Sequence, residues 1–175
     1  MEYLDIVDSQ NKVIGKAPRA DIYQYKLPHR IVHVLVFNEK RELLLQRRSK
    51  QAGYRPLHWG TSAGGHVQSG EDYKQAAQRE YLEELGARTE VKPVGTFFYG
   101  DPLEENKGLS RFITVFYTLH NGPFLLEQKE LHDAHFLSLE EIKRKVKGGE
   151  PFTPQLLYVL HKFLKIPHYN RFTFV

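Results

Sequence analysis

Residues 65–87 read GHVQSGEDYKQAAQREYLEELGA, and this segment is the most informative part of the chain. It combines glycines, a helical pattern that carries Glu80, Glu83 and Glu84, and a stop at Gly86. Each helical residue advances by about 100°, so the three carboxylates share an arc of about 100°. Like charges this close repel one another, and the hard oxygen ligands suit Mg²⁺ or Mn²⁺. The segment therefore indicates a metal site that acts on a diphosphate.

The same segment carries signals for where its helix begins and ends. We expect a helix over residues 70–85, with Ser69 as the N-cap and Asp72 as an approximate capping-box partner. Gly86 stands where a left-handed C-cap is wanted. The glycine pair at 64–65 precedes the helix after a short predicted strand, and it lets backbone groups approach a metal or phosphate closely.

An acidic helix face in solvent, with Arg79 as a partial counter-charge, is the plain alternative for an isolated Glu-x-x-Glu-Glu. The complete segment, however, resembles the Nudix box, G-x5-E-x7-R-E-U-x-E-E-x-G-U, in which U is a bulky apolar residue. Tyr81 and Ala87 depart from the pattern at two bulky positions, both on the packing side of the helix. The fixed positions that match are Gly65, Glu71, Arg79, Glu80, Glu83, Glu84 and Gly86.

The resemblance implies an α/β Nudix fold, a mixed β-sheet sandwiched between α-helices, with the box as loop–helix–loop. It also implies hydrolysis of a nucleoside diphosphate linked to another moiety, or of a related diphosphate, with Mg²⁺ or Mn²⁺ as cofactor. Carried over by position, the metal ligands would be Glu80, Glu83 and Glu84, helped by the Gly65 carbonyl.

Two further roles follow from the resemblance. Arg79 and Glu71 would form the ion pair that fixes the loop against the helix. One of the box carboxylates, or a glutamate from a later loop, would orient or deprotonate the attacking water. Glu127 and Glu130 are the candidates for that later glutamate, although a surface position is the simpler explanation for each.

The opening of the chain resembles the isopentenyl-diphosphate isomerase-like branch of the Nudix group. In the true isomerase, histidines and glutamates hold a metal, and a cysteine two residues before a histidine transfers protons. Here His29 and His66 fall at two histidine positions, but Gly64 takes the place of the cysteine, and the chain contains none. Isomerase activity is therefore not expected, and both histidines stay open between a site role and ordinary hydrogen bonding. The segments that carry this resemblance are LDIVD (4–8), VIGKAPR (13–19), LPHR (27–30) and LLLQRR (43–48).

Arg47 and Arg48 end a predicted strand close to the box and are candidates for substrate binding. Guanidinium groups suit phosphate oxygens, and consecutive strand residues point to opposite faces. We therefore expect at most one of them to enter the cleft. Specificity is expected in the loops at 48–58 and 100–110, and neither loop identifies the leaving group.

A module that binds a nucleotide or diphosphate without turnover is the alternative to an enzyme. The complete carboxylate set favours the enzyme, because a binding module has less need of all three. The substrate is a small-molecule diphosphate whose identity the sequence leaves open.

Elsewhere the chain reads as one Nudix domain over residues 1–175. Apolar β-branched runs predict strands, and cap residues predict helix starts. The expected strands lie at 2–7, 12–16, 31–38, 42–47, 59–63, 91–99, 112–120 and 134–137, and the later helices follow Ser138 and Thr153.

Composition excludes several classes of protein. Apolar residues make up 41% and charged residues 26%, which is the balance of an ordinary globular chain. The longest apolar runs fall well short of the roughly 20 residues that span a bilayer. The N-terminus lacks a signal pattern, so a cytoplasmic location is expected. The net charge of +4 comes without a nucleic-acid-binding motif. Neither a membrane nor a nucleic acid is therefore expected as a partner, and a homodimer stays open.

Overall fold

The structure is a computed structural model that describes residues 1–101, 107–127 and 131–166. The strands are β1 (Tyr3–Val7), β2 (Val13–Pro18), β3 (His29–Phe37), β4 (Leu43–Arg48), β5 (Trp59–Gly60), β6 (Ala63–His66), β7 (Lys92–Gly100), β8 (Ser110–Leu119) and β9 (Leu131–Leu137). The helices are α1 (Arg19–Gln24), α2 (Tyr73–Leu85), α3 (Leu139–Lys147) and α4 (Pro154–Leu164).

The main sheet is mixed and runs in the order β5-β4-β3-β8-β7, with β6 paired to β3 and β9 paired to β4. Strand β3 lies at its centre and runs parallel to β8, whereas it pairs antiparallel with β4 and β6. The long apolar run predicted as a buried strand therefore forms the middle of the sheet.

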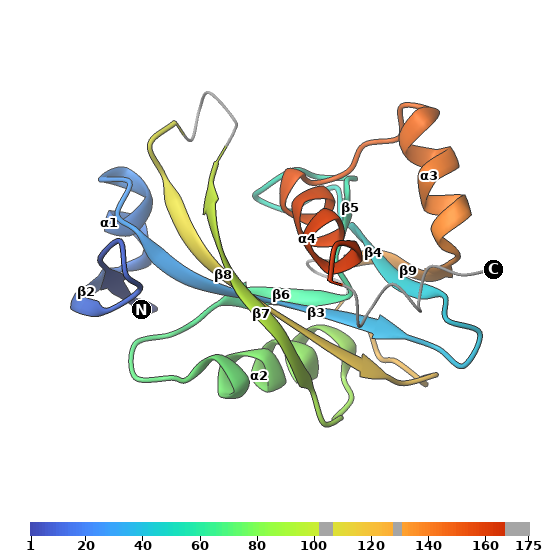
Figure 1. The fold of residues 1–175 in the computed structure, drawn as a ribbon, viewed down its shortest axis with the longest axis horizontal. Coiled ribbons are helices and arrows are strands. Elements are labelled where there is room, and N and C mark those ends of the chain that lie inside the picture. The colour runs from blue at the N-terminus through green and yellow to red at the C-terminus, as the bar shows by residue number, and fades with distance from the viewer. Residues whose placement is uncertain (102–106, 128–130, 167–175) are drawn as a thin grey trace.

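Side-chain alternation along β3 divides the interior into two cores. Ile31, Leu35 and Phe37 belong to a cluster that includes apolar residues of α3 and α4. Their neighbours at 32, 34 and 36 belong to a second cluster with α2. In Figure 1, α2 and α4 accordingly lie on opposite sides of the sheet. The predicted α/β fold, with helices on both faces of a mixed sheet, is confirmed.

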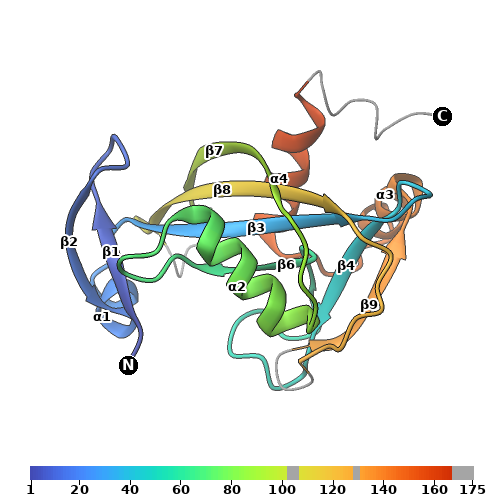
Figure 2. The same cartoon turned by 90° about the horizontal axis from the view of Figure 1, so that it is seen from below.

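The N-terminal hairpin of β1 and β2 lies at one end of the molecule together with α1 (Figure 2). Leu4, Ala17 and Ile22 form a small core inside it. Backbone hydrogen bonds join it to the segment before α2, including Ser69 N to Tyr3 O at 2.8 Å. The hairpin was predicted, but α1 was not, and α1 brings new side chains to the edge of the box.

The start of α2 corrects one prediction. Asp72, rather than Ser69, is the N-cap, and the helix begins at Tyr73. The Asp72 carboxylate accepts a hydrogen bond from Gln75 N at 2.8 Å, and the Gln75 side chain accepts one from Asp72 N at 2.9 Å. The predicted stop is confirmed, since Gly86 adopts a left-handed φ of 62°.

The predicted strand at 59–63 is also wrong in its bounds. Two short strands replace it, because β5 pairs with β4 whereas β6 pairs with β3. Gly64 and Gly65 therefore lie inside β6, opposite His33 and Val32. A Cβ at Gly64 would lie 2.6 Å from Val32 O, so glycine allows this close strand pairing.

Candidate active site

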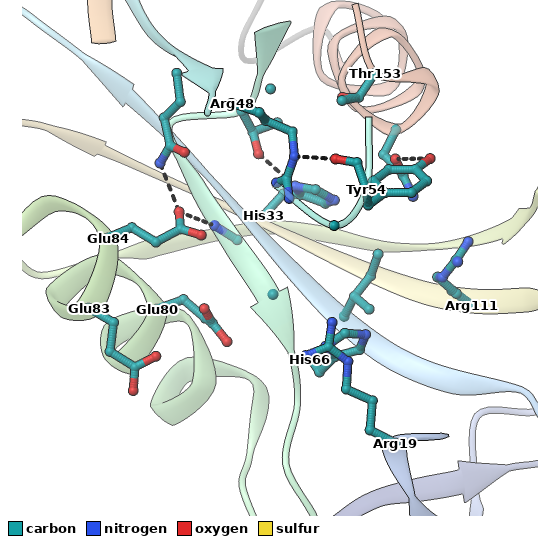
Figure 3. Close-up of a pocket in the computed structure, with 18 of the residues that line it drawn as sticks. Arg19, His33, Arg48, Tyr54, His66, Glu80, Glu83, Glu84, Arg111 and Thr153 are labelled. Carbon is teal, nitrogen blue, oxygen red and sulfur yellow. Dashed lines mark hydrogen bonds between the residues drawn. The ribbon is translucent and has the colours of Figure 1, made fainter. Parts of the chain in front are cut away.

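A cleft of about 820 Å³ is lined by residues of α2, of strands β3, β4, β6 and β8, and of helices α1 and α4. Figure 3 shows Glu80, Glu83 and Glu84 reaching it from α2 on one side. Arg19, Arg48 and Arg111 approach from the other sides. We call the three glutamates the acidic wall. The cleft therefore has carboxylates on one side and arginine side chains on its other sides.

Glu84 is the most enclosed member of the acidic wall. Its Oε2 accepts hydrogen bonds from Gln46 Nε2 at 2.8 Å and from Gly64 N at 3.2 Å. Burial raises the pKa of Glu84 to about 8, against the effect of the Gln46 bond, and the nearby Glu80 carboxylate adds to the rise. A nearby positive charge would therefore stabilise the ionised form of this buried carboxyl group.

Glu80 lies against the glycine of β6. Its side chain is 12% exposed, and Arg79 Nη1 donates to its Oε1 at 2.7 Å. A Cβ on Gly65 would collide with the Glu80 carboxylate, so a side chain at this position would have to displace that carboxylate. Burial raises the Glu80 pKa, although Arg79 opposes this. Glu83 differs, because 56% of its side chain is exposed.

Arg79 ties the acidic wall to the loop before α2. Its Nε and Nη2 donate to the two Glu71 carboxylate oxygens at 2.7 and 3.0 Å. Nη2 also donates to His66 O at 2.8 Å. Burial opposes ionisation of Glu71, but Arg79 and the backbone N of Gln68 more than offset it and lower the Glu71 pKa. The ion pair implied by the sequence resemblance is present, in the bidentate geometry typical of strong pairs.

The acidic wall fits a divalent cation by its chemistry. Within the described ranges, no three His, Asp or Glu side chains are gathered around one point in ligating positions. Arg79 and Gln46 instead hold Glu80 and Glu84. The donors are all hard oxygens, and burial raises the pKa of both held carboxylates. A cation would relieve that cost, and the exposed Glu83 side chain has room to turn towards it.

The two candidate arginines separate as the strand alternation predicts. Arg48 lines the cleft, and its Nε donates to Tyr54 O at 2.6 Å. Arg47 points elsewhere, with its guanidinium carbon 5.9 Å from the centroid of the Trp59 ring. Substrate binding by Arg47 is therefore not supported, whereas Arg48 is well placed.

Of the two candidate late glutamates, Glu127 lies among the described residues. The backbone N of Glu127 donates to Glu84 O at 3.1 Å, beside the end of α2. Glu127 is not among the described residues that line the cleft. Glu130 lies outside the described residues. Part of the predicted specificity loop at 100–110 also lies outside them, whereas Tyr54 of the other loop lines the cleft.

His29 and His66 are held by protein partners. His29 Nδ1 donates to Leu27 O at 3.0 Å, and His66 Nε2 lies 2.8 Å from the Tyr23 hydroxyl. Burial lowers the His29 pKa to about 4, and the cation of Arg111 adds to this effect. Burial, His29 and nearby arginines likewise lower the His66 pKa. These contacts favour the hydrogen-bonding interpretation over metal ligation.

The residues that line the cleft but were not identified from the sequence include Arg19, Tyr23 and Arg111. Arg19 and Tyr23 come from the unpredicted helix α1. Arg111 stands at the start of β8, and its side chain is 3% exposed and paired to Asp101 at 2.7 Å. The one available signal was a charged residue directly before an apolar strand run.

The chain is similar to known proteins along most of its length. The sequence matches the NUDIX domain over residues 27–156. It is 34% identical over 168 residues to the Nudix hydrolase PA4841 of Pseudomonas aeruginosa, covering 93% of this chain and 94% of the relative. It is 32% identical over 165 residues to the Nudix hydrolase YfcD of Escherichia coli, covering 94% of this chain and 87% of the relative.

Solved structures show the same fold. DR0079 from Deinococcus radiodurans superposes with a TM-score of 0.79 at 26% identity, covering 92% of this chain and 98% of that one. The NUDIX domain of Shewanella oneidensis NrtR, solved with ADP ribose, shares the fold at 13% identity, with a TM-score of 0.60 and coverage of 83% and 96%. The box, the sheet between helices and these relatives agree: this chain belongs to the Nudix family and is a Nudix-type diphosphate hydrolase.

Proposed function

We propose that this protein is a Mg²⁺- or Mn²⁺-dependent hydrolase of a nucleoside diphosphate linked to another moiety, or of a related diphosphate. The observation that carries the proposal is the acidic wall of α2, which faces a cleft that arginines also line. The cleft volume of about 820 Å³ falls within the roughly 300–1,000 Å³ usual for ligand pockets. A nucleotide-sized substrate therefore has room between the two kinds of side chain.

Glu80, Glu83 and Glu84 are the proposed metal ligands, with the Gly65 carbonyl. A divalent cation supplies two effects when bound, a lowered pKa of its water and neutralised charge on the diphosphate. One of the three carboxylates orients the attacking water and takes its proton. Arg79 holds two of these carboxylates in position and is also ion-paired to the preceding loop.

Arg48 is the proposed contact for a diphosphate oxygen. Its guanidinium reaches the cleft from β4, whereas its Nε is fixed by the Tyr54 carbonyl. A guanidinium presents its N–H donors in a rigid fork that matches phosphate oxygens, so the Tyr54 contact sets the direction from which Arg48 meets a diphosphate. Tyr54 belongs to the loop expected to carry specificity, so substrate binding and loop position are coupled here.

The wider assignments belong to the same proposal. A small-molecule diphosphate is the expected partner, in the cytoplasm, and a homodimer stays open. Nucleic-acid binding is not expected. The whole chain of residues 1–175 is treated as one Nudix domain. Among the described residues, the longest helices are too short or too polar to cross a bilayer.

The test is a product assay with Mg²⁺ and Mn²⁺ across a substrate panel. The panel holds nucleoside diphosphate sugars, ADP-ribose, dinucleotides, coenzyme A, nucleoside triphosphates and isopentenyl diphosphate. Glu84→Gln is the variant, and Glu140→Gln on the solvent side of α3 is the matched control. Metal-dependent cleavage that Glu84→Gln loses and Glu140→Gln keeps would support the hydrolase.

Other results of the panel point elsewhere. Ligand binding without any product would favour a non-catalytic nucleotide-binding module. Interconversion of isopentenyl diphosphate would instead overturn the inference drawn from Gly64 and the missing cysteine.

A further inference from the structure

The side of the cleft opposite α2 is built from side chains of three separate elements. Arg19 and Tyr23 come from α1, His66 from β6 and Arg111 from β8, and all four line the cleft. We call this group the basic wall. Its role is not explained by the cleavage chemistry assigned to the acidic wall.

Arg111 supplies a buried positive charge. It is 2% exposed, and its Nη1 donates to Asp101 Oδ2 at 2.7 Å. Its guanidinium carbon also lies 5.8 Å from the centroid of the Tyr23 ring. A buried arginine is costly unless it is well paired, and its cation polarises the aromatic ring beside it. The charge is therefore held at the back of the basic wall, behind Tyr23.

Tyr23 and His66 form the polar surface in front of that charge. The Tyr23 hydroxyl lies 2.8 Å from His66 Nε2, and their rings meet edge to face with centroids 5.8 Å apart. Nearby cations disfavour a charged imidazole at this position. His66 thus holds the Tyr23 hydroxyl through Nε2, with its Nδ1 3.7 Å from Glu2 Oε1, and adds no charge of its own.

Arg19 is the accessible cation of the wall. In Figure 3 its guanidinium rises into the cleft beside His66. Its side chain is 54% exposed, and Nη1 donates to Glu2 Oε2 at 3.1 Å. Exposed pairs of this kind are weak, and a guanidinium has five N–H donors. An incoming anion can therefore share or displace Glu2.

The charges on the two sides of the cleft determine where an anion would bind. A free phosphate is repelled by the carboxylates of α2, above all by the exposed Glu83, and attracted by the exposed Arg19 opposite, with the ion-paired Arg111 behind it. The diphosphate that is cleaved must lie near the acidic wall with its metal. The basic wall is then left for another part of the substrate.

We propose that the basic wall is a subsite for a phosphate group that the substrate carries in addition to the diphosphate being cleaved. This inference rests on the proposed function for its substrate, although not for the binding of phosphate itself. The additional group is either a terminal phosphate of the same chain or a monoester on a ribose. Both present a phosphate group that carries up to two negative charges to Arg19.

The first test uses inorganic phosphate as the probe, in EDTA, so that no metal contributes. Binding is followed by ¹H–¹⁵N NMR titration for the wild type, Arg19→Gln and Tyr23→Phe. Lys74→Gln is the matched control, because Lys74 is 51% exposed, ion-paired to Glu90 and outside the cleft.

Loss of a charge-assisted contact should weaken phosphate binding about tenfold in Arg19→Gln. Tyr23→Phe should weaken it several-fold, and Lys74→Gln should bind as the wild type does. Equal affinity in the wild type and Arg19→Gln, or no phosphate binding by the wild type, would overturn the subsite.

The second test compares matched substrates in the metal-loaded enzyme. Adenosine triphosphate with adenosine diphosphate probes a terminal phosphate, and coenzyme A with dephospho-coenzyme A probes a ribose monoester. We expect kcat/KM to favour the additional phosphate about tenfold in one pair, and Arg19→Gln to remove that preference. The pair that responds identifies the source of the phosphate.

The two proposals fail in different ways. Cleavage with no preference in either pair, or a preference that Arg19→Gln retains, would overturn the subsite and leave the hydrolase intact. Absence of cleavage for every substrate would count against the proposed function, while the phosphate titration would still decide whether the basic wall binds anions.

Discussion

The acidic and basic walls face the same cleft but are assembled in opposite ways. The acidic wall comes from consecutive turns of α2, and one residue of that helix, Arg79, bonds two of its members. The basic wall joins α1, β6 and β8, and it depends on contacts between residues far apart in the chain, such as Tyr23 with His66. One wall is a local motif, whereas the other is a product of the tertiary fold.

Burial acts on both walls in the same direction, towards neutral groups. It raises the pKa of Glu84 to about 8 and lowers the pKa of His29, behind the basic wall, to about 4. The residues that keep an accessible charge are Glu83 and Arg19, whose side chains are 56% and 54% exposed. Within the two walls, the most accessible negative charge is therefore that of Glu83 and the most accessible positive charge that of Arg19.

Removing the charge of Glu84 should have the largest effect. Glu84→Gln keeps an oxygen that can accept from Gln46 and from Gly64 N, so the fold should persist. Metal binding contributes several kcal/mol to such reactions, so we expect kcat/KM to fall about 10³-fold. Steady-state assays with Mg²⁺ measure this, and EDTA treatment of the wild type should match it. A fall of less than tenfold would mean that the acidic wall is not the metal site.

Removing Arg79 should break the framework of the acidic wall. Arg79→Met leaves the partly buried Glu71 and Glu80 carboxylates without their cation. Deleting one partner of such a pair costs about 3–5 kcal/mol, so the free energy of unfolding should fall by that amount. Urea denaturation measures it, with Arg88→Met at an exposed position as the control. Equal stability of the two variants would contradict the ion network.

His29, whose ring lies beside those of Tyr23 and His66 in the basic wall, should make the stability of the protein depend on acid. The folded-state pKa of His29 is about 4, below its ordinary 6.5, because of burial and the cations of Arg111 and Arg19. Between these values the unfolded chain binds a proton that the folded chain does not. Stability is therefore complete above pH 6.5 and falls as the pH drops towards 4, by about 3 kcal/mol for this residue.

His29→Asn tests this assignment, because its amide can still donate to Leu27 O. Urea denaturation of both proteins between pH 7 and 4 gives, for each, the slope of the free energy of unfolding against pH. The variant should lack the part of the acid-induced loss of stability that comes from His29. It should keep the part that comes from His33, whose pKa is also about 4. Identical slopes in the two proteins would show that His29 does not titrate in this way.

A substitution at the contact between β6 and α2 should have the smallest effect on stability. A methyl group at Gly65 must displace the Glu80 carboxylate, and such overpacking costs about 1–3 kcal/mol. Gly65→Ala should therefore lower stability and weaken Mn²⁺ binding. Gly100→Ala is the control, because a Cβ there meets nothing within 4 Å. If the two alanine variants behave alike, Glu80 does not depend on the glycine.

The acidic wall and the sheet were predictable from sequence because their signals are local and periodic. The run at 31–38 alternates between two cores, and the box fixes three carboxylates on one helix face. The N-cap was harder, because Ser69 and Asp72 are both good caps. The structure selects Asp72, since Gly70 adopts a φ of 89° within a turn closed by Glu71 N to Gln68 O.

The basic wall was not predictable for a physical reason. Helix α1 has six residues and no side-chain cap, so nothing local marks it. Arg19, Tyr23 and Arg111 carry no common spacing, and only the fold brings them together. The sequence also did not predict that the strand expected at 59–63 is divided into β5 and β6. That division depends on pairing with two different strands, β4 and β3.

The central claim is that the carboxylates of α2 bind the divalent cation that serves the reaction. Electron paramagnetic resonance of Mn²⁺ measures this directly, by the free ion signal lost on titration with protein. We predict that the wild type and Glu140→Gln bind Mn²⁺ and that Glu84→Gln binds it at least about tenfold more weakly. Equal binding by all three proteins, or no binding by the wild type, would contradict the claim.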